Sequence, residues 1–236
     1  MSKLRVAVIG VGFFAVNQLR AWRDIEAVEV AAICDTRPER LAEIAGQFGI
    51  ARCYTDAAVM LGAERPDFVD IATGTASHRA LVELAAAHRL PVICQKPFAP
   101  SLEDARAMVA CCERAGVPLM VHENFRWQSP LRAVAEVLRS GRIGTPFWAR
   151  ISFRSGFDVY VHQPYLATVE RFIIADLGIH LLDLARYLLG DVVDLSARAQ
   201  RVNPRIGGED VATMLLRHER GAVSVVECSY ASHPVE

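Results

Sequence analysis

The sequence is poor in the features that mark membrane proteins and charge-binding proteins. None of its apolar stretches reaches the roughly 20 residues of a membrane-spanning helix. Its 26 basic and 27 acidic residues are interspersed and leave a formal net charge of −1, which argues against nucleic acid or a membrane surface as a partner. A secretory signal pattern is also missing before the first apolar run, so we expect a cytoplasmic protein that binds a small molecule.

The six cysteines lack the Cys-x-x-Cys spacing of zinc and redox sites, and several lie in apolar patterns where a thiol acts as a small hydrophobic group. We therefore expect neither a zinc site nor a disulfide framework. Internal repeats and long flexible linkers are absent as well. With 52% hydrophobic residues, the 236-residue chain can bury a large core in one large or two modest domains.

The opening of the chain carries a nucleotide-binding pattern. An apolar run at residues 4–9 leads into Gly10-Val11-Gly12-Phe13-Phe14-Ala15, where the glycines let a pyrophosphate approach the main chain and the next helix offers its N–H groups. A second apolar run at 28–34 ends in Asp35, near the expected place of the carboxylate that binds the ribose hydroxyls of NAD. The alternatives are a plain glycine turn and, for Asp35, a loop or helix-capping residue.

Strands and helices alternate through the first half of the chain. Apolar patterns predict helices at 38–48, 56–61, 77–88 and 101–114, and strands at 52–54, 67–72, 91–94 and 117–121. Ser101 and Asp104 resemble a capping box at the start of the last of these helices. This alternation is typical of parallel βαβ units. Residues 1–122 are therefore predicted to form a doubly wound, α/β dinucleotide-binding domain of the Rossmann type.

The pattern changes in residues 123–236. A helix is expected at 130–139, a strand with alternating faces at 147–153, an irregular loop to about 165 and a helix at 175–189. Strands follow at 193–202, 211–218 and 222–230, the last two joined by a hairpin turn at 219–221. These elements predict an α+β domain with an open, mostly antiparallel sheet. The sheet looks truncated, with an edge that would seek a partner.

Lys96 is the first candidate for chemistry. The strand at 91–94 runs into Gln95-Lys96-Pro97, and the carboxyl ends of strands in an open parallel sheet border the ligand crevice. Pro97 also restricts the conformation of the residue before it. Lys96 is therefore expected close to a bound nicotinamide. A solvated surface lysine is the alternative.

The helix at 175–189 carries the second candidate group. Asp176, His180 and Asp183 lie at positions i, i+4 and i+7, so a regular helix places them on one face beside a leucine stripe. A histidine there can take a proton near neutral pH, and a carboxylate one turn away can orient it or bind a substrate hydroxyl. The alternatives are a structural histidine capped by Asp183 and, less favoured, a metal site, which hydride transfer does not need.

Taken in order, the glycine motif, Gln95-Lys96-Pro97 and Asp176-x-x-x-His180-x-x-Asp183 resemble the glucose-fructose oxidoreductase/inositol dehydrogenase/MocA family across essentially the whole chain. The resemblance implies a Rossmann domain joined to an open-sheet α/β domain that carries the substrate pocket and the oligomer contacts. It also implies oxidation of a sugar or polyol with a nicotinamide cofactor. Segments 121–127 and 171–176 look like those of D-apiose dehydrogenases within this family, which implies an aldose oxidised to its lactone.

The resemblance assigns roles position by position. Lys96 corresponds to the lysine that binds cofactor and substrate and takes part in proton transfer, and Asp176 and His180 to the pair that holds and deprotonates the substrate hydroxyl. We take His180 as the general base. The implied cofactor contacts, besides Gly10, Gly12, Phe13, Phe14, Asp35 and Gln95, are Thr73, Gly74, His78 and Asn124. The expected substrate contacts, besides Lys96, Asp176 and His180, are Arg126, Trp127, Arg154, Asp158, His162 and Arg171.

Two departures from the family pattern stand out. Gln95 replaces the usual glutamate before the lysine, which removes a negative charge but keeps a hydrogen-bonding group. The chain is also shorter than family members typically are, which suggests a truncated form, a natural short form or an impaired enzyme.

Our sequence-based interpretation is a cytoplasmic NAD-dependent dehydrogenase in which a sugar lies between Lys96 and His180. The Asp35 carboxylate would repel the 2′-phosphate of NADP, whereas Arg37 could pair with it, so NAD is favoured and NADP stays open. We expect a homodimer or homotetramer formed through the C-terminal sheet. The alternative function is an NAD-binding sensor or subunit without turnover.

Overall fold

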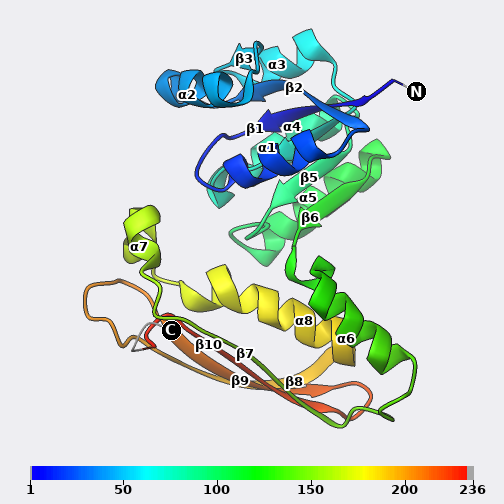
Figure 1. The fold of residues 1–236 in the computed structure, drawn as a ribbon, viewed down its shortest axis with the longest axis vertical. Coiled ribbons are helices and arrows are strands. Elements are labelled where there is room, and N and C mark those ends of the chain that lie inside the picture. The colour runs from blue at the N-terminus through cyan, green and yellow to red at the C-terminus, as the bar shows by residue number, and fades with distance from the viewer. Residues whose placement is uncertain (1, 233–236) are drawn as a thin grey trace. The chain divides into compact units, whose positions relative to one another are not determined.

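The computed structural model describes residues 2–232, except for the side chain of His162, one of the expected substrate contacts, which lies outside the described part. The described chain divides into two compact units between His122 and Glu123 (Figure 1). The first unit runs to His122 and the second begins at Glu123. None of the helices in residues 2–232 is both long and apolar enough to cross a membrane.

The first unit is built on a parallel sheet. The described residues contribute six strands, in the order β3-β2-β1-β4-β5-β6. Their bounds are β1 (Leu4–Ile9), β2 (Val28–Cys34), β3 (Cys53–Tyr54), β4 (Phe68–Ile71), β5 (Val92–Gln95) and β6 (Leu119–His122). All neighbouring pairs are parallel. This is the strand order of the doubly wound dinucleotide-binding fold, in which ligands bind at the carboxyl ends of the strands near the reversal between β1 and β4.

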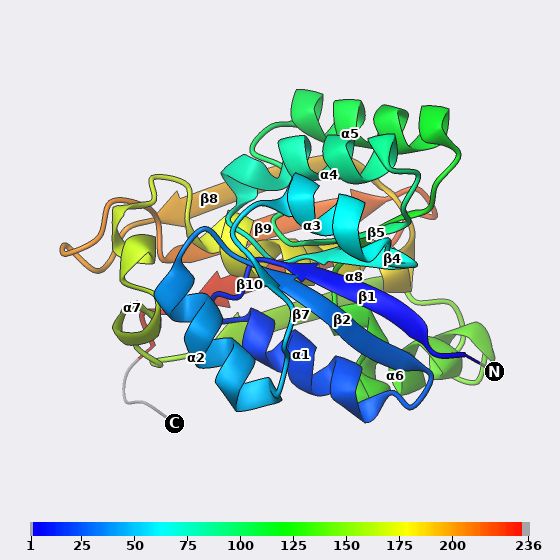
Figure 2. The same ribbon diagram turned by 90° about the horizontal axis from the view of Figure 1, so that it is seen from above.

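Helices cover both faces of this sheet (Figure 2). They are α1 (Ala15–Asp24), α2 (Pro38–Phe48), α3 (Ala57–Glu64), α4 (His78–Ala87) and α5 (Leu102–Ala115), with a short 3-10 turn at Thr75–Ser77. Side chains of β1 alternate between the two cores, because successive residues of a strand point to opposite faces. Val6 and Val8 pack with α1 and α2, whereas Ala7 and Ile9 pack with α3, α4 and α5.

Local sequence signals fix several of these helix ends. Pro38 occupies the first turn of α2, and Gly49 ends that helix in the left-handed conformation, with φ of 69°. At the start of α5, the Asp104 N–H donates to Ser101 Oγ (3.0 Å) and the Ser101 hydroxyl donates to Asp104 Oδ2 (2.6 Å). The predicted capping box is therefore confirmed.

The second unit is a mixed sheet with helices on one face. Its strands are β7 (Trp148–Arg154), β8 (Val192–Gln200), β9 (Val211–His218) and β10 (Val223–Ser229). Within the described residues their order is β7-β10-β9-β8, with β8, β9 and β10 antiparallel and β7 parallel to β10. The helical segments are α6 (Ser129–Arg139), α7 (Val159–His162), α8 (Ile179–Leu189), 3-10 turns at Phe125–Trp127 and Pro164–Thr168, and a π-helical turn at Ile174–Gly178.

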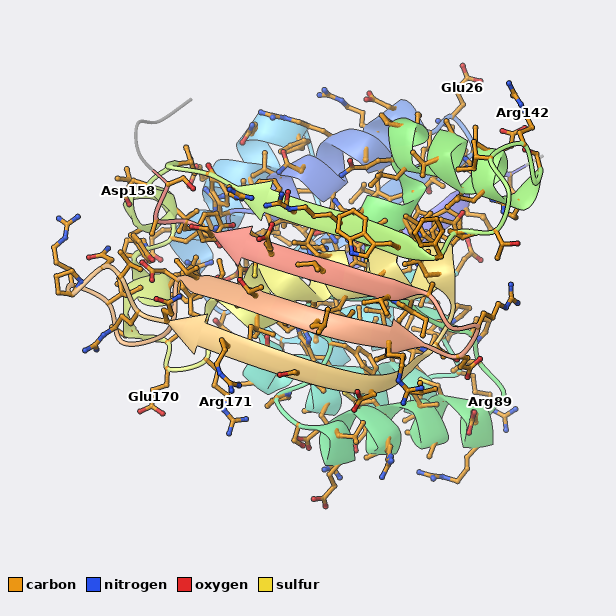
Figure 3. All side chains as sticks on the ribbon, turned by 90° about the horizontal axis from the view of Figure 1, so that it is seen from below. Glu26, Arg89, Arg142, Asp158, Glu170 and Arg171 are labelled. Carbon is orange, nitrogen blue, oxygen red and sulfur yellow. The ribbon has the colours of Figure 1, made fainter. Side chains whose placement is uncertain are left out.

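Helix α8 packs its apolar side on this sheet. Leu181 and Ala185 join a core with Met214, Leu216 and Val226. The alternate residues of β9, among them Leu215, point to the opposite face, which Figure 3 shows toward the viewer. The predicted α+β domain with a mostly antiparallel sheet is therefore confirmed for residues 123–232.

The structure changes one detail of the predicted helix at 175–189. Its first turn is a π-helix, in which the Ile179 N–H donates to the Ile174 carbonyl five residues earlier. Regular α-helical geometry begins only at Ile179. The spacing i, i+4, i+7 assumes α-helical geometry throughout, so the placement of Asp176 on the face of His180 and Asp183 stays a prediction.

Candidate functional site

The glycine turn between β1 and α1 has room for a ligand on one side only. Gly10 has φ of +92°, and a Cβ there would lie 2.7 Å from Thr73 Cγ2 and 2.8 Å from the carbonyl carbon of Ala72. A Cβ on Gly12 would meet no atom within 4 Å among the described residues. Gly10 is therefore needed for close packing against the β4 loop, and Gly12 faces open space. This is the arrangement that a pyrophosphate requires at the start of a helix.

Arg40 fixes the backbone of this turn, a role that sequence reasoning missed. Its Nε donates to the Val11 carbonyl (2.8 Å) and its guanidinium also reaches the Gly12 carbonyl (3.3 Å). No sequence pattern indicated this role, because Arg40 is one of several charged residues in the ordinary helical pattern of α2. Phe13 and Phe14 are exposed beside the turn, and the Phe14 ring approaches His122 edge-on at 6.3 Å.

Asp35 directly follows β2 and carries a buried carboxylate. It accepts hydrogen bonds from the Val11 N–H (3.0 Å), the Arg37 N–H (3.0 Å) and the Arg37 guanidinium (3.0 and 3.2 Å). Burial raises the pKa of Asp35, but the hydrogen bonds from Arg37 and Val11 outweigh it and hold the pKa below its ordinary value. Asp35 is thus an ionised acceptor next to the glycine turn. The helix-capping alternative does not hold, because Arg37 is the capping residue of α2.

His78 ties together the loops that follow β4 and β5. It is fully buried, with Nε2 3.0 Å from the Thr73 carbonyl and Nδ1 3.0 Å from the Phe98 carbonyl. Ser77 adds a hydrogen bond from its hydroxyl to Thr73 Oγ1 (2.7 Å) and contacts the Gly74 carbonyl (2.9 Å). Thr73 and Gly74 are therefore held in place at the carboxyl edge of the sheet, with Gly74 ahead of the short 3-10 turn.

Lys96 follows β5 at the same edge, and Gln95 shapes its backbone. Gln95 Oε1 accepts the Lys96 N–H (2.7 Å), and the Lys96–Pro97 peptide bond is cis. Gln95 Nε2 is buried and lacks a hydrogen-bond partner among residues 2–232. A glutamate at this position could not offer such a donor.

In the second unit, His180 is buried against two residues that sequence reasoning did not connect to it. Its Nδ1 lies 2.6 Å from Glu123 Oε1, and its ring stacks on Phe125 with centroids 4.2 Å apart and an interplanar angle of 9°. The alternative of a structural histidine capped by Asp183 is wrong, because the partner of His180 Nδ1 is Glu123. Glu123 is 57 positions away and lies in a segment without helical or strand periodicity, so no sequence signal pointed to it.

Asp183 is instead engaged by Arg126. The Arg126 Nε donates to Asp183 Oδ2 (2.6 Å), and a second guanidinium nitrogen pairs with Oδ1. The guanidinium also lies over the Tyr187 ring, 5.1 Å from its centroid. Arg126, an expected substrate contact, thus anchors the turn at Phe125–Trp127 to α8. The exposed indole of Trp127 and the partly buried Asn124 belong to the same segment.

The charge of Asp176 acts on two tyrosines of the second unit. Burial and then the Asp176 charge raise the pKa of Tyr165 and of Tyr230. The Tyr165 hydroxyl also donates to Gln163 Oε1 (3.0 Å). Phenol groups, which can donate and accept hydrogen bonds, are therefore within electrostatic reach of this carboxylate. Sequence reasoning missed both tyrosines, because aromatic residues in a loop and at a strand end carry no periodic signal.

The other expected substrate residues are spread over this unit. Arg154 pairs with Glu227 (3.2 Å) on the sheet face opposite α8, so the structure does not bring it to His180. Asp158 accepts the Tyr160 N–H (3.1 Å) at the start of α7. Arg171 is exposed. Figure 3 shows Asp158 and Arg171 at the same end of the sheet but at opposite edges, not pointing toward each other.

Among the residues that the structure describes, no group of three or more His, Cys, Asp or Glu side chains is arranged to hold a metal ion. The polar groups described above suit an organic ligand with hydroxyl and phosphate groups.

Two family models match the chain. Residues 4–123 match the oxidoreductase family with an NAD-binding Rossmann fold, and residues 131–236 match the GFO/IDH/MocA C-terminal domain. The chain is 63% identical to D-apiose dehydrogenase of Rhizobium rhizogenes over 98% of its own length and 67% of that protein. It is also 63% identical to D-apiose dehydrogenase of Paraburkholderia graminis, over 98% of this chain and 62% of that one.

A solved structure shares the fold closely. The crystal structure of an oxidoreductase from Agrobacterium radiobacter, in complex with NAD+, L-tartaric acid and magnesium, has a TM-score of 0.96 and 63% sequence identity. The match covers 98% of this chain and 68% of that one. The chain thus spans about two thirds of the length of its named relatives.

Proposed function

Because this chain belongs to the GFO/IDH/MocA oxidoreductase family, whose N-terminal domain is an NAD-binding Rossmann fold, we propose that it is a sugar dehydrogenase that oxidises D-apiose with NAD. The observation that carries the proposal is the buried His180, fixed at Nδ1 by Glu123, in a unit whose sequence relatives act on D-apiose. The expected product is the lactone, since an aldose ring carries its reactive hydroxyl at the hemiacetal carbon.

The first unit supplies the cofactor side of the reaction. Open space at Gly12 and the ionised Asp35 fit the pyrophosphate and ribose of a dinucleotide. We assign cofactor contacts to the glycine motif with Phe13 and Phe14, and to Thr73, Gly74, Lys96 and Asn124. His78 acts behind them, because its ring holds the Thr73 loop from within the core.

NAD is favoured over NADP. Asp35 carries its charge where a 2′-phosphate would come, and Arg37 is occupied by that same carboxylate. NADP binding would require Arg37 to leave Asp35 and pair with the phosphate. We therefore expect turnover with NADP to be weaker than with NAD.

The chemistry assigned to the side chains is proton transfer coupled to hydride loss. The glycine motif and Asp35 would hold NAD+, which would supply the acceptor for the hydride of the reacting C–H bond. His180 takes the hydroxyl proton at Nε2, so the C–O bond becomes a carbonyl and charge balances. Asp176 accepts hydrogen bonds from neighbouring substrate hydroxyls, and Lys96 stabilises the developing alkoxide.

The test is NADH formation by the purified chain with D-apiose and a panel of other aldoses and polyols, followed by absorbance. We expect D-apiose to give the highest kcat/KM. His180→Ala and Lys96→Ala should lower kcat by about 10² to 10⁴-fold, the usual contribution of a general base, with the fold intact by circular dichroism.

Tight NAD binding without turnover on any of these substrates would contradict the proposal and support an NAD sensor or subunit. Turnover that survives in both variants would contradict the assignment of the two residues. Repeating the absorbance assay with NADP in place of NAD measures the cofactor preference.

We further propose that copies of the chain associate through the sheet of the second unit. The face away from α8 carries exposed Leu215 with Val225 beside it on the next strand. Apolar side chains at the centre of an open sheet face favour burial against a second protein surface. NAD is kept inside cells, so a dehydrogenase that uses it is expected in the cytoplasm.

A further inference from the structure

We propose that Glu123 is the positioning residue of the catalytic base: its carboxylate holds the Nδ1 proton of His180 and directs proton transfer to Nε2. This inference rests on the proposed dehydrogenase function and deepens it. Neither the family motifs nor the helix pattern points to residue 123, and only the folded chain brings it to the imidazole.

The contact is short and shielded from water. Glu123 Oε1 lies 2.6 Å from His180 Nδ1, and the two side chains are 14% and 8% exposed. An ionised carboxylate only accepts hydrogen bonds, so Nδ1 must carry the proton. The neutral imidazole then presents its lone pair at Nε2. The partner of one ring nitrogen thus decides which nitrogen can act as a base.

Glu123 itself is held in place. Its Oε1 also accepts the Phe125 N–H at 3.0 Å, and the Phe125 ring lies parallel to the imidazole. The segment 123–125 therefore fixes His180 twice, with a carboxylate at Nδ1 and an aromatic ring on one face. Such double restraint leaves the imidazole little freedom to turn.

The competing carboxylate on α8 is already engaged. Asp183 is three residues after His180 on the same helix, but Arg126 binds both of its oxygens. A carboxylate neutralised in this way has little capacity left for an imidazole. The pairing of Arg126 with Asp183 therefore leaves the task at Nδ1 to Glu123.

The charge of Glu123 also matters once the proton has moved. Taking the substrate proton turns His180 into an imidazolium, and a buried carboxylate at 2.6 Å stabilises that cation by a charge-assisted hydrogen bond. Glu123 therefore serves two purposes, since it selects the tautomer before the reaction and stabilises the cation during it. The two can be separated by substitution.

Two substitutions, Glu123→Gln and Glu123→Ala, separate the selection of the tautomer from the stabilisation of the cation. The glutamine keeps an oxygen acceptor for the Nδ1 proton but removes the charge, whereas the alanine removes both. For Glu123→Ala we expect kcat to fall about 10- to 10³-fold, a part of the contribution of a general base, with KM for NAD and sugar changed less than threefold. Glu123→Gln should keep more of the activity.

The pH profile provides a readout that loss of packing would not move. Without the carboxylate the imidazolium is less favoured, so the acidic limb of kcat against pH should shift to lower pH in both variants. The matched control is Asp191→Asn, which removes a carboxylate from an exposed pair with Arg186 after the far end of α8. We expect it to leave kcat and the pH profile unchanged.

The tautomer can be measured without turnover. In ¹⁵N NMR of the full chain, with the His180 signal assigned by its loss in His180→Gln, we expect the Nδ1–H tautomer in the wild type and in Glu123→Gln. Glu123→Ala should show a mixture with Nε2–H. An Nε2–H tautomer in the wild type, or wild-type kcat and pH profile in Glu123→Ala, would overturn the proposal. If no sugar is oxidised, the proposed function fails and the tautomer alone decides the role of Glu123.

Discussion

Asp70 is a buried carboxylate in the centre of the first unit, outside the groups assigned to chemistry. It is fully buried on β4 and accepts the Trp22 indole N–H (2.7 Å) and the Gln18 amide (3.1 Å). Burial raises the pKa of Asp70 to about 6, and the hydrogen bond from Trp22 offsets only part of that effect. The side chain therefore changes its charge within the range of ordinary buffers.

This shift makes stability depend on pH in a defined direction. Because the folded-state pKa lies above the ordinary value of 3.8, the native state binds a proton that the unfolded chain releases between about pH 4 and 6. The stabilisation from that proton is fully present below pH 4 and is lost as the pH rises through about 6. Above that pH the ionised Asp70 carboxylate lowers the free energy of unfolding.

Asp70→Asn should remove this destabilisation. We expect the variant to be more stable than the wild type at pH 8, by up to the order of 3 kcal/mol, because one pKa unit corresponds to about 1.4 kcal/mol. The difference should shrink toward pH 4. Urea unfolding at a series of pH values measures it, and parallel stability curves for the two proteins would refute the assignment.

At the scale of an element, the turn between β1 and α1 separates folding from ligand binding. Gly10 needs its positive φ and touches the loop after β4, whereas Gly12 borders space that no described protein atom fills. The same substitution at the two positions should therefore have different consequences.

Gly10→Ala should destabilise the fold by about 1 to 3 kcal/mol, the range for a strained backbone, since its methyl group would meet main-chain atoms. Gly12→Ala should melt like the wild type and bind NAD at least about tenfold more weakly, because its methyl group enters the space assigned to the pyrophosphate. Thermal unfolding and NAD titration by protein fluorescence test the pair. Unchanged NAD affinity in Gly12→Ala would contradict the assigned site.

The sequence predicted elements well where local chemistry decides them. The bounds of α2 follow from Pro38 and Gly49, and those of α5 from the Ser101 capping box, because each signal acts within a few residues. The carboxylate at Asp35 was found in the same way, from a motif of fixed spacing. The roles of the predicted site residues stay predictions until they are measured.

Interactions between distant residues could not be predicted in this way. Glu123 and His180 are 57 positions apart, and their contact depends on how the whole second unit folds. The π-turn at Ile174–Gly178 likewise depends on packing, and no spacing in the sequence indicated it. A pattern of spacings assumes regular geometry, so an irregular turn is invisible to it.

At the scale of the whole molecule, association through the second sheet predicts a change of mass. Leu215→Asp places a charge in the centre of the open face and should convert the assembly to smaller species, as measured by light scattering after size exclusion. Val59→Asp, at an equally exposed apolar position on α3, is the control. An assembly of unchanged mass in Leu215→Asp would place the interface elsewhere.

The parallel pairing of β7 with β10 has a consequence for how the second unit is made. Val223 pairs with Trp148, 75 positions earlier in the chain, so β7 cannot enter its sheet until β10 has left the ribosome. Closing so long a loop costs entropy before any pairing compensates for it, and contacts of this range slow folding. During synthesis β7 therefore stays without its partner strand until β10 has been made.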